Sequence, residues 1–576
     1  MKKFIAMFLA MVMVMGVFGV VASADDVTEV ALKVWAPQED QASADSWLQQ
    51  MEAKFEAAHP EYKITWTNEV CGEDRAKDEV SKDPAAAADV YMFANDQLGD
   101  KLVACQLPTV TIGGEAKSLK SFAGIWLMPI HPSVTYHKYD VMDYYDIDPQ
   151  YGTMADFDNF LAECEARDIR VILDLVLNHT GVDHPWFRAA SEYLATLEDG
   201  QEPDPSVCPY VDYYFFDKEP VTSCYYDVEG TSWQYEGKFW SGMPDLNLGN
   251  ESLREEIRGI MQFWLDKGVA GFRLDAAKEF YSGSPSKNCE VLSFLMDTAR
   301  SIKPDAYLVA EVWESFTTIA DYYTSGITSI FNFPFGDGSG KIVSVLRGAG
   351  NAKTVSSFAT AQEKADTAYR GGNPDFIDAP FLSNHDTGRI AGFCSYDENK
   401  IKLAGAMNLF MSGNAFVYYG EELGMSGSGN DPSKRAPMLW NEARDDGTTD
   451  PPPECELPES YPFGSLEVQR QQEDSIWNYY RQAIAIRKEN PVIYRGTPTA
   501  ETALNANCVS AVRKTWQDES CIILMNIQDA QAAVDLTDYA DYTLTARLTV
   551  DENQVMMEGS VLTLPPYAVA VLTQNK

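Results

Sequence analysis

Residues 268–280 have the sequence GVAGFRLDAAKEF, and the mostly apolar run from Val269 to Leu274 predicts a strand covered on both faces. Arg273 and Asp275 stand out at the end of this run. They are two residues apart, so their side chains point to the same side of the strand. Burying two charges is costly unless they are paired or take part in chemistry. This stretch alone is consistent with either a structural salt bridge or a functional site.

Strand-like and helix-like segments alternate on both sides of this stretch. Single helical crossovers between strands indicate parallel pairing. Strands with polar residues at their C-terminal ends predict a (β/α)8 barrel over residues 111–490, with its active site at that end. An open doubly wound sheet is the alternative. The predicted strands are 124–130 (GIWLMPI), 170–179 (RVILDLVLNH), 269–275, 307–313 (YLVAEVW), 327–335 (ITSIFNFPF), 379–386 (APFLSNHD) and 414–422 (NAFVYYGEE).

Two further domains are predicted outside the barrel pattern. Residues 180–248 are too many for a structureless loop and are rich in aromatic residues. They predict a small inserted domain with most of these rings in its core, although such rings can also stack on sugar faces. Residues 491–576 alternate in short strands, a pattern typical of a terminal β-sandwich.

Acidic residues stand at the C-terminal ends of three different predicted strands: Asp275, Glu311 and Asp386. In a barrel these ends meet at one mouth. A structural salt bridge does not need that convergence, whereas cleavage of an acetal does, because one carboxyl group protonates the leaving oxygen and another attacks the sugar carbon. The two carboxyl groups must differ in pKa. Arg273 is expected to hold Asp275 ionised, and apolar neighbours suit Glu311 to the role of the acid.

Six segments of the chain, in order and at sensible spacings, resemble signature segments of the α-amylase family of glycoside hydrolases. The resemblance spans about residues 124–576 and implies a retaining mechanism on α-linked glucans. The segments are GIWLMPI with YDVMDYYDIDPQYGT (139–153), DLVLNH (174–179), MPDLN (243–247), GFRLDAAKE (271–279), EVW (311–313) and FLSNHD (381–386).

The resemblance also implies a role for each matched residue. Asp275 is the expected nucleophile, Glu311 the acid and base, and Asp386 the residue that grips the distorted sugar. The expected substrate-binding residues are Arg273, which orients Asp275; His179 and His385, which contact sugar hydroxyls; Tyr139, which stacks on the sugar; Asp140, which helps to build the pocket; and Lys278, which follows the nucleophile.

Starch and maltodextrins, cleaved at α-1,4 bonds, are the expected substrates. Lys278 stands where endo-acting α-amylases of the family usually carry a lysine. The MPDLN segment is shared with enzymes that cut cyclodextrins or α-1,6 branches, so a neopullulanase- or cyclomaltodextrinase-like specificity is an alternative. A non-catalytic maltodextrin-binding protein with a disrupted barrel is a second alternative, against which the complete catalytic set argues.

One metal ion is implied by the resemblance. Asn178 resembles a ligand of a structural calcium ion, to which oxygens of the inserted domain would add, and hard oxygen donors suit calcium. However, Glu279 stands where many calcium-binding relatives have a histidine. The alternative for Asn178 is a hydrogen-bonded anchor of its loop.

The chain departs from the family pattern before residue 124. Residues 28–105, within a segment 25–110, resemble part of the N-terminal lobe of an extracellular sugar-binding protein of the maltodextrin-transporter type. We expect a fusion, in which the barrel borrows residues 88–95 (ADVYMFAN) as its first strand or stays open. A barrel without one strand has exposed edges.

Export is predicted by residues 1–24, which have a basic start, an apolar run and a small-residue cleavage pattern typical of a secretory signal peptide. An uncleaved anchor is the alternative, because the apolar run is nearly long enough to span a bilayer. The net charge of −41 argues against a nucleic-acid or anionic-membrane partner. We therefore expect a secreted protein whose partner is an α-glucan.

The cysteines show no CxxC pair, which gives no indication of a zinc site. Export permits disulfides. By local spacing, Cys208 with Cys224 and Cys508 with Cys521 are the expected pairs, whereas Cys164 and Cys289 are expected to be free thiols.

Overall fold

The computed structural model describes residues 28–36, 47–58, 62–70, 90–91, 110–112, 115–117, 123–198, 200–220, 223–445, 447–458, 460–504 and 508–575. The signal peptide predicted at 1–24 lies outside these residues. Within them, no helix is long and apolar enough to cross a bilayer. The chain divides into two compact units, one of which runs from Gly124 to the C-terminus except for residues 162–169.

The N-terminal unit contains a three-stranded parallel sheet with the strand order β2-β1-β3. Buried side chains of the first strand and of the helix, among them Val34 and Leu48, form its core. This is the α/β arrangement expected for the segment. Its elements are β1 (Thr28–Ala36), α2 (Trp47–Ala58), β2 (Tyr62–Val70) and β3 (Val90–Tyr91), followed by the hairpin of β4 (Val110–Ile112) and β5 (Glu115–Lys117).

The expectation that residues 88–95 lend the barrel its first strand is wrong for the described part of that segment. β3 pairs in parallel with β1, with Val90 opposite Val34 and Tyr91 opposite Trp35. β1 already has β2 on its other edge, so β3 completes this small sheet. Among the described residues, β3 makes no pairing with a barrel strand.

The barrel is built on a parallel sheet with the strand order β13-β12-β11-β7-β6. The two remaining predicted strands continue it as extended segments. Phe331 forms a parallel bridge with Ala379, and the Asn414 and Phe416 N–H groups donate to the carbonyls of Asp378 and Pro380. All the predicted strands thus follow one another in sheet order, as in a (β/α)8 barrel. The regular strands are β6 (Ala123–Leu127), β7 (Ile169–Leu175), β11 (Gly271–Leu274), β12 (Tyr307–Ala310) and β13 (Ser329–Ile330).

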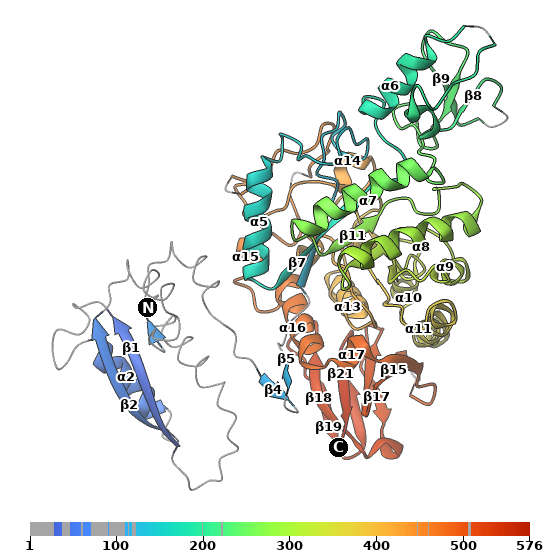
Figure 1. Ribbon diagram of the computed structural model, residues 1–576. Helices are drawn as coiled ribbons and strands as arrows, with labels where there is room; N and C mark the ends of the chain where they lie inside the picture. Colours follow the sequence, from blue (N-terminus) through green and yellow to red (C-terminus); the bar gives the residue numbers. More distant parts are fainter. Residues whose placement is uncertain are drawn as a thin grey trace. The chain divides into compact units, whose positions relative to one another are not determined.

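Helices surround these strands. In Figure 1, β7 and β11 are seen among the helices α5, α7 and α8. The longer ones bury one apolar face; α7, for example, buries Leu253, Ile257 and Trp264, and the Asn250 side chain caps its N-terminus. The helices are α5 (Met154–Ala166), α7 (Glu251–Asp266), α8 (Pro285–Ile302), α9 (Phe316–Tyr323), α10 (Lys341–Arg347), α11 (Ala352–Gly372), α12 (Ile390–Phe393), α13 (Glu398–Leu409), η4 (Glu421–Leu423), α14 (Asp431–Lys434), α15 (Leu466–Gln469), α16 (Ile476–Glu489) and α17 (Val492–Arg495).

Gly271, within the stretch 268–280, lies where β11 and β12 approach each other closely. A Cβ atom added to Gly271 would lie 1.8 Å from the Tyr307 carbonyl oxygen, so only glycine lets β11 and β12 approach this closely. Inside the barrel, aromatic rings pack in a cluster that includes Phe331 and Phe381, with Trp126 and Phe416 against it. This close packing fixes the strand register that positions the residues at the strand ends.

The inserted domain has its own aromatic core, as predicted. The Phe187 ring lies 5.1 Å from the Tyr214 ring and 4.8 Å from the Tyr235 ring, centroid to centroid. Phe239 and Trp240, by contrast, are exposed. Its elements are α6 (Pro185–Leu194), η3 (Pro209–Asp212), β8 (Phe216–Asp217), β9 (Tyr225–Asp227) and β10 (Gln234–Glu236), with the antiparallel strand order β8-β10-β9.

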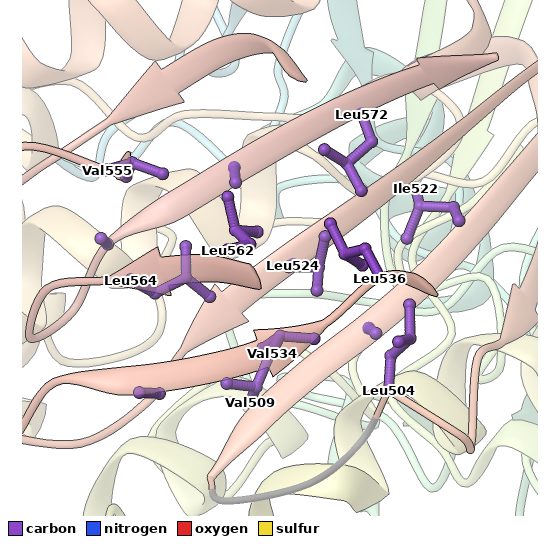
Figure 2. Packing of buried hydrophobic residues seen from close by; sticks show 14 of the residues in the cluster. Leu504, Val509, Ile522, Leu524, Val534, Leu536, Val555, Leu562, Leu564 and Leu572 are labelled. Atoms are coloured by element: carbon purple, nitrogen blue, oxygen red, sulfur yellow. The ribbon is translucent and has the colours of Figure 1, made fainter. Parts of the chain in front are cut away.

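The predicted C-terminal sandwich consists of antiparallel sheets with the strand orders β14-β15-β16-β21-β18 and β17-β20-β19. Figure 2 shows its core, in which Leu524 and Leu572 of one sheet pack with Leu562 and Leu564 of the other. The elements are β14 (Thr497–Ala500), β15 (Val509–Trp516), β16 (Glu519–Asn526), β17 (Ala532–Asp535), η5 (Thr537–Tyr539), β18 (Tyr542–Leu548), β19 (Met556–Glu558), β20 (Val561–Leu564) and β21 (Val569–Gln574).

The expected disulfides are absent from the described residues, where Cys208, Cys224, Cys508 and Cys521 are all free thiols. The register of β15 and β16 explains one case. Cys521 lies opposite Lys514, whereas Cys508 lies at the other end of the pair, beside Ile527. Six residues of strand separate them by about 20 Å, far beyond the reach of a disulfide. Cys164 and Cys289 are free, as expected.

Candidate active site

The register of three neighbouring strands aligns the charged residues at their ends. Arg273 of β11 lies directly opposite Asp174 of β7, and Leu274 lies opposite Ala310 of β12. The residues that follow, Asp275 and Glu311, therefore leave their strands at the same level. Parallel pairing between strands far apart in the sequence thus brings three carboxylates and one guanidinium together.

Arg273 is the centre of this group and is almost completely buried. Its Nη1 atom donates to both Asp174 oxygens, at 2.8 and 2.9 Å, and to Asp275 Oδ1 at 2.6 Å. Its Nη2 atom lies 2.9 Å from Glu311 Oε2. The Trp126 ring faces the guanidinium, with its centroid 5.2 Å from the carbon. One planar cation therefore holds three acids from three strands, a geometry that suits arginine and not lysine.

The acidic side chains of the site differ in how much of their surface is exposed. The Asp174 side chain is fully buried, whereas the side chains of Asp275, Glu311 and Asp386 are 10%, 13% and 34% exposed. The three acids predicted as catalytic can therefore be reached from the barrel mouth. Asp174, to which the sequence analysis assigned no role, is more deeply buried and pairs with Arg273.

A strained residue follows Asp275. Ala276 has a φ of 45°, in the left-handed region that side chains other than glycine rarely adopt. This conformation points its N–H group at Glu311, whose Oε2 accepts the hydrogen bond at 3.0 Å. Backbone strain of this kind persists only where surrounding contacts enforce it, and it is common at functional sites.

Asp386 is held from two sides. Its Oδ2 lies 3.1 Å from His385 Nε2, and its Oδ1 accepts from Arg435 Nη2 at 3.2 Å. Sequence reasoning missed Arg435, because it lies in an irregular segment beyond the last predicted strand and no periodic pattern marks it. The Arg435 guanidinium also pairs with Asp431, whereas its buried Nε and Nη1 atoms have no hydrogen-bond partner in the described part of the chain.

Tyr139 contacts both the acids around Arg273 and the histidine that holds Asp386. Its hydroxyl donates to Asp174 Oδ2 at 3.0 Å, accepts from Arg273 Nη1 at 3.2 Å and lies 2.7 Å from His385 Nε2. Its ring stacks on His385 with the centroids 5.6 Å apart. The sequence prediction placed Tyr139 and His385 at one site, and the structure brings them into contact.

The remaining predicted residues lie around this centre. Asp140 is buried and accepts hydrogen bonds from the Ser133 and Thr135 hydroxyls. His179 is buried against the exposed Phe239 ring, 5.2 Å away, and its Nε2 has no hydrogen-bond partner among the described residues. Lys278 points to the loop after β12, where its ammonium group donates to the Trp313 carbonyl at 3.1 Å.

Burial and charge shift the pKa values of these groups in different directions. Burial raises the pKa of Asp275 well above its usual range, and the positive charge of Arg273 opposes that rise without cancelling it. The contact with Arg273 is as predicted, but the expectation that it alone would keep Asp275 ionised is too simple, because neighbouring acids also raise this pKa. With more carboxylates than cations, the group favours holding a proton.

The pKa values of Asp386 and His179 are lowered, whereas that of Asp275 is raised. Burial opposes ionisation of Asp386, but His385, Arg435 and Arg273 together hold its pKa well below the usual value. Burial lowers the pKa of His179 to about 3, so its imidazole is neutral. The site therefore combines a firmly ionised carboxylate, that of Asp386, with a neutral histidine, His179.

Asn178, the predicted calcium ligand, does not sit in a set of donors that suits calcium. Its Nδ2 atom, a hydrogen-bond donor, faces Asp245 Oδ1 at 3.1 Å. The ammonium group of Lys238 pairs with Glu279 beside it, at 3.2 Å. No cluster of three or more acidic, histidine or cysteine side chains in the described ranges could hold a metal ion. Asn178 instead anchors its loop, as in the alternative interpretation.

Comparison with known proteins gives a consistent assignment. Residues 117–496 match the family model "Alpha amylase, catalytic domain". Alpha-amylase 3 of Dictyoglomus thermophilum is 37% identical over 71% of this chain and 77% of its own length. The structure of Eubacterium rectale Amy13B is 41% identical, with a TM-score of 0.75, over 80% of this chain and 89% of its own. A more distant relative, glucan 1,6-alpha-glucosidase of Streptococcus pneumoniae, is 26% identical over 77% of this chain and 89% of its own length.

The comparisons do not support the resemblance of residues 28–105 to a sugar-binding protein, and the family match begins only at residue 117. That resemblance stays a prediction. The matched region contains every residue that the site described above is built from.

Proposed function

The chain belongs to the α-amylase family and is a glycoside hydrolase of that family, and from this premise we propose that it cleaves α-1,4 bonds of starch and maltodextrins with retention of configuration. Asp275 is the nucleophile, and Glu311 is the general acid and base. The observation that carries the proposal is the contact of one buried guanidinium, that of Arg273, with both residues. Two carboxyl groups fixed to one rigid cation have the paired placement that acetal cleavage needs.

The reaction divides into two steps. In the first, Glu311 gives its proton to the glycosidic oxygen while an Asp275 oxygen forms a bond to the anomeric carbon, and the shortened glucan leaves as an alcohol. In the second, Glu311 takes a proton from water, whose oxygen attacks the same carbon and releases Asp275 as a carboxylate. Two inversions restore the α configuration.

The surrounding residues bind and orient the sugar. Asp386, firmly ionised, accepts hydrogen bonds from sugar hydroxyls and stabilises positive charge at the anomeric carbon. His179 and His385 are the residues that the resemblance implies contact sugar hydroxyls, and the Nε2 of His385 faces Tyr139 and Asp386. Tyr139 covers the sugar, Asp140 fixes the pocket wall, and Lys278 contacts the loop after β12.

Arg435 positions Asp386, and its removal gives the first specific prediction. We expect Arg435→Met to lower kcat/KM for maltoheptaose about 10²-fold, mostly through kcat, because Asp386 acts on the transition state. Arg435 lowers the pKa of Asp386, so its loss raises that pKa. The acidic limb of the kcat/KM profile is set by Asp275, whose pKa is the higher of the two, and should not move.

The split between kcat and KM separates this role from a purely structural one. Arg435→Lys keeps the charge and is expected to restore part of kcat. Arg300→Met, an exposed arginine of α8, serves as the control and should change neither kcat nor KM. An unchanged kcat in Arg435→Met would contradict the positioning role.

The α-1,4 preference rests on similarity. The relative named alpha-amylase is 37% identical to this chain, and the relative named for 1,6 bonds is 26% identical. Lys278 supports the same choice, since it stands where the endo-acting members carry a lysine. Product release from maltoheptaose, compared with isomaltotriose, measures the preference directly, and faster cleavage of isomaltotriose would reverse it.

Glu311→Gln tests the acid role. We expect release of reducing sugar from soluble starch to fall on the order of 10³-fold, because glutamine cannot donate the proton. An aryl α-maltotrioside with a highly acidic phenol needs no protonation to leave. For this substrate kcat/KM is expected to stay within about tenfold of the unsubstituted protein, whereas kcat falls because Glu311 also acts as the base of the second step.

Glu290→Gln makes the same chemical change at an exposed carboxylate of α8 and is the matched control. It should leave both activities unchanged. Equal losses of kcat/KM on starch and on the activated glycoside would show that Glu311 is not the general acid. Starch cleavage absent from the unsubstituted, folded protein would reject the proposed function itself.

A further inference from the structure

The seam between the inserted domain and the barrel runs beside the active site. Asp245 forms an antiparallel bridge with His179, and the Leu246 N–H donates to the Asn178 carbonyl at 2.9 Å. The Thr180 N–H donates to the Pro244 carbonyl at 3.1 Å. Hydrogen bonds therefore connect the segment that leaves the inserted domain to residues 178–180, which follow β7.

Negative charge accumulates at this seam. Asp245 is buried, Glu236 precedes it in the inserted domain, and Glu279 belongs to the barrel segment just after Asp275. The charges of Glu236 and Glu279 act on Asp245, and that of Lys238 opposes them. A buried carboxylate beside like charges favours a nearby cation.

Lys238 reaches both sides of the seam. Its backbone N–H donates to Asp245 Oδ2 at 3.0 Å, and its ammonium group lies 3.2 Å from Glu279 Oε2. Glu279 is held in turn by the Ser282 hydroxyl at 2.5 Å. The lysine, which belongs to the inserted domain, therefore ties that domain to the barrel segment that follows the predicted nucleophile.

The Asn178 side chain completes this arrangement. It donates from Nδ2 to Asp245 Oδ1 at 3.1 Å. Asp245 thus receives one hydrogen bond on each of its oxygens, one from each domain. A calcium ion would have to displace donors that the chain already supplies, and an ammonium charge lies beside it.

We propose that Lys238 is the permanent cation of this seam, takes the place that the family resemblance predicts for calcium, and makes the fold of this protein independent of calcium. The seam positions two ligand-facing groups. Phe239 directly follows Lys238, and its exposed ring packs on His179, which directly follows Asn178. Lys238 therefore also fixes the wall of the active site on the side of the inserted domain.

The melting temperature tests the proposal without reference to activity. For the purified full chain, we expect the same Tm, within about 1 °C, in 5 mM EDTA and in 5 mM calcium chloride. Terbium, a luminescent probe for calcium sites, should show no saturable binding at micromolar concentration. A Tm that rises with calcium or falls with EDTA, or saturable terbium luminescence, would overturn the proposal.

The variant Lys238→Met tests whether Lys238 supplies the positive charge at the seam. We expect its Tm in EDTA to fall by about 2–4 °C, and calcium to restore part of the loss, because the acids are then left without their cation. Lys238→Arg keeps the charge and should show neither effect. An unchanged Tm in Lys238→Met, or a lowered Tm that does not respond to calcium, would contradict the replacement of calcium by Lys238.

Lys267→Met is the matched control. Lys267, which directly follows α7, pairs with Asp158 at 2.8 Å and lies away from the seam. Its loss should change Tm only slightly and should create no response to calcium. Because none of these measurements uses a substrate, their outcome is independent of the proposed glycosidase mechanism.

Discussion

Replacing Asp275 by asparagine is expected to lower kcat/KM for maltoheptaose by about 10⁵-fold, the largest loss of any single substitution in the site. Asparagine keeps the shape and volume of the side chain, but it cannot form the ester bond to the anomeric carbon. The residual activity comes from the positioned acid and the remaining pocket. Initial rates of reducing-sugar release at high enzyme concentration measure the loss.

Stability should change in the opposite direction. The pKa of Asp275 is raised in the folded protein, so the folded state binds more protons than the unfolded state, and stability is lost as the pH rises above the unfolded value. Asparagine has no ionisable group, so the variant does not lose this stability as the pH rises. We therefore expect the Tm of Asp275→Asn relative to the unsubstituted protein to be higher at pH 8 than at pH 5.

Asp305→Asn is the control for this variant. Asp305 forms a largely exposed ion pair with Arg170, so kcat/KM should be unchanged and Tm should shift little. Asp275→Asn with more than about 1% of the activity would place the nucleophile elsewhere.

Removing Arg273 should affect both activity and stability. Arg273→Met leaves Asp174, whose side chain is fully buried, without its charge partner. Breaking a buried ion pair in this way costs about 3–5 kcal/mol. Activity should fall about 10⁴-fold, because Asp275 and Glu311 lose the group that fixes their relative placement.

A double-mutant cycle with Asp174→Asn shows which interaction accounts for the stability lost in Arg273→Met. Asparagine removes the buried charge, so the double variant Asp174→Asn/Arg273→Met is expected to be more stable than Arg273→Met alone. Calorimetric Tm values of the four proteins give the comparison. Additive effects of the two substitutions would show that the buried pair is not the source of the loss. Arg273→Lys should recover little activity, because an ammonium group cannot reproduce the planar fork.

Much of the site followed from the sequence because strand ends and carboxylates are visible in it. The apolar run before Arg273, and the acids after it and after two other strands, indicated one mouth of one barrel. The inserted domain and the sandwich followed from aromatic density and strand alternation. What was missed had no such signal: Arg435 lies in an irregular segment, and Asp174 could not be recognised as the partner of Arg273 before the register was known.

Other predictions were wrong where they depended on distance and not on pattern. Local spacing suggested Cys508 and Cys521 as a pair, but they lie at opposite ends of two antiparallel strands. The segment 88–95 looked like a barrel strand by its spacing, yet its described part pairs with β1. Spacing along the chain limits which residues can meet, and only pairing decides which of them do.

By itself, the sequence determined the order of strands and helices, the family and the acids that we propose as catalytic, because periodicity and residue type are local properties that each segment carries wherever it lies. The tertiary structure alone decided that one guanidinium serves three acids, that Arg435 holds Asp386, and that Lys238 stands between the inserted domain and the barrel. These contacts join residues far apart in the chain, and their strength depends on burial and on distances of a few ångströms, which no linear pattern contains.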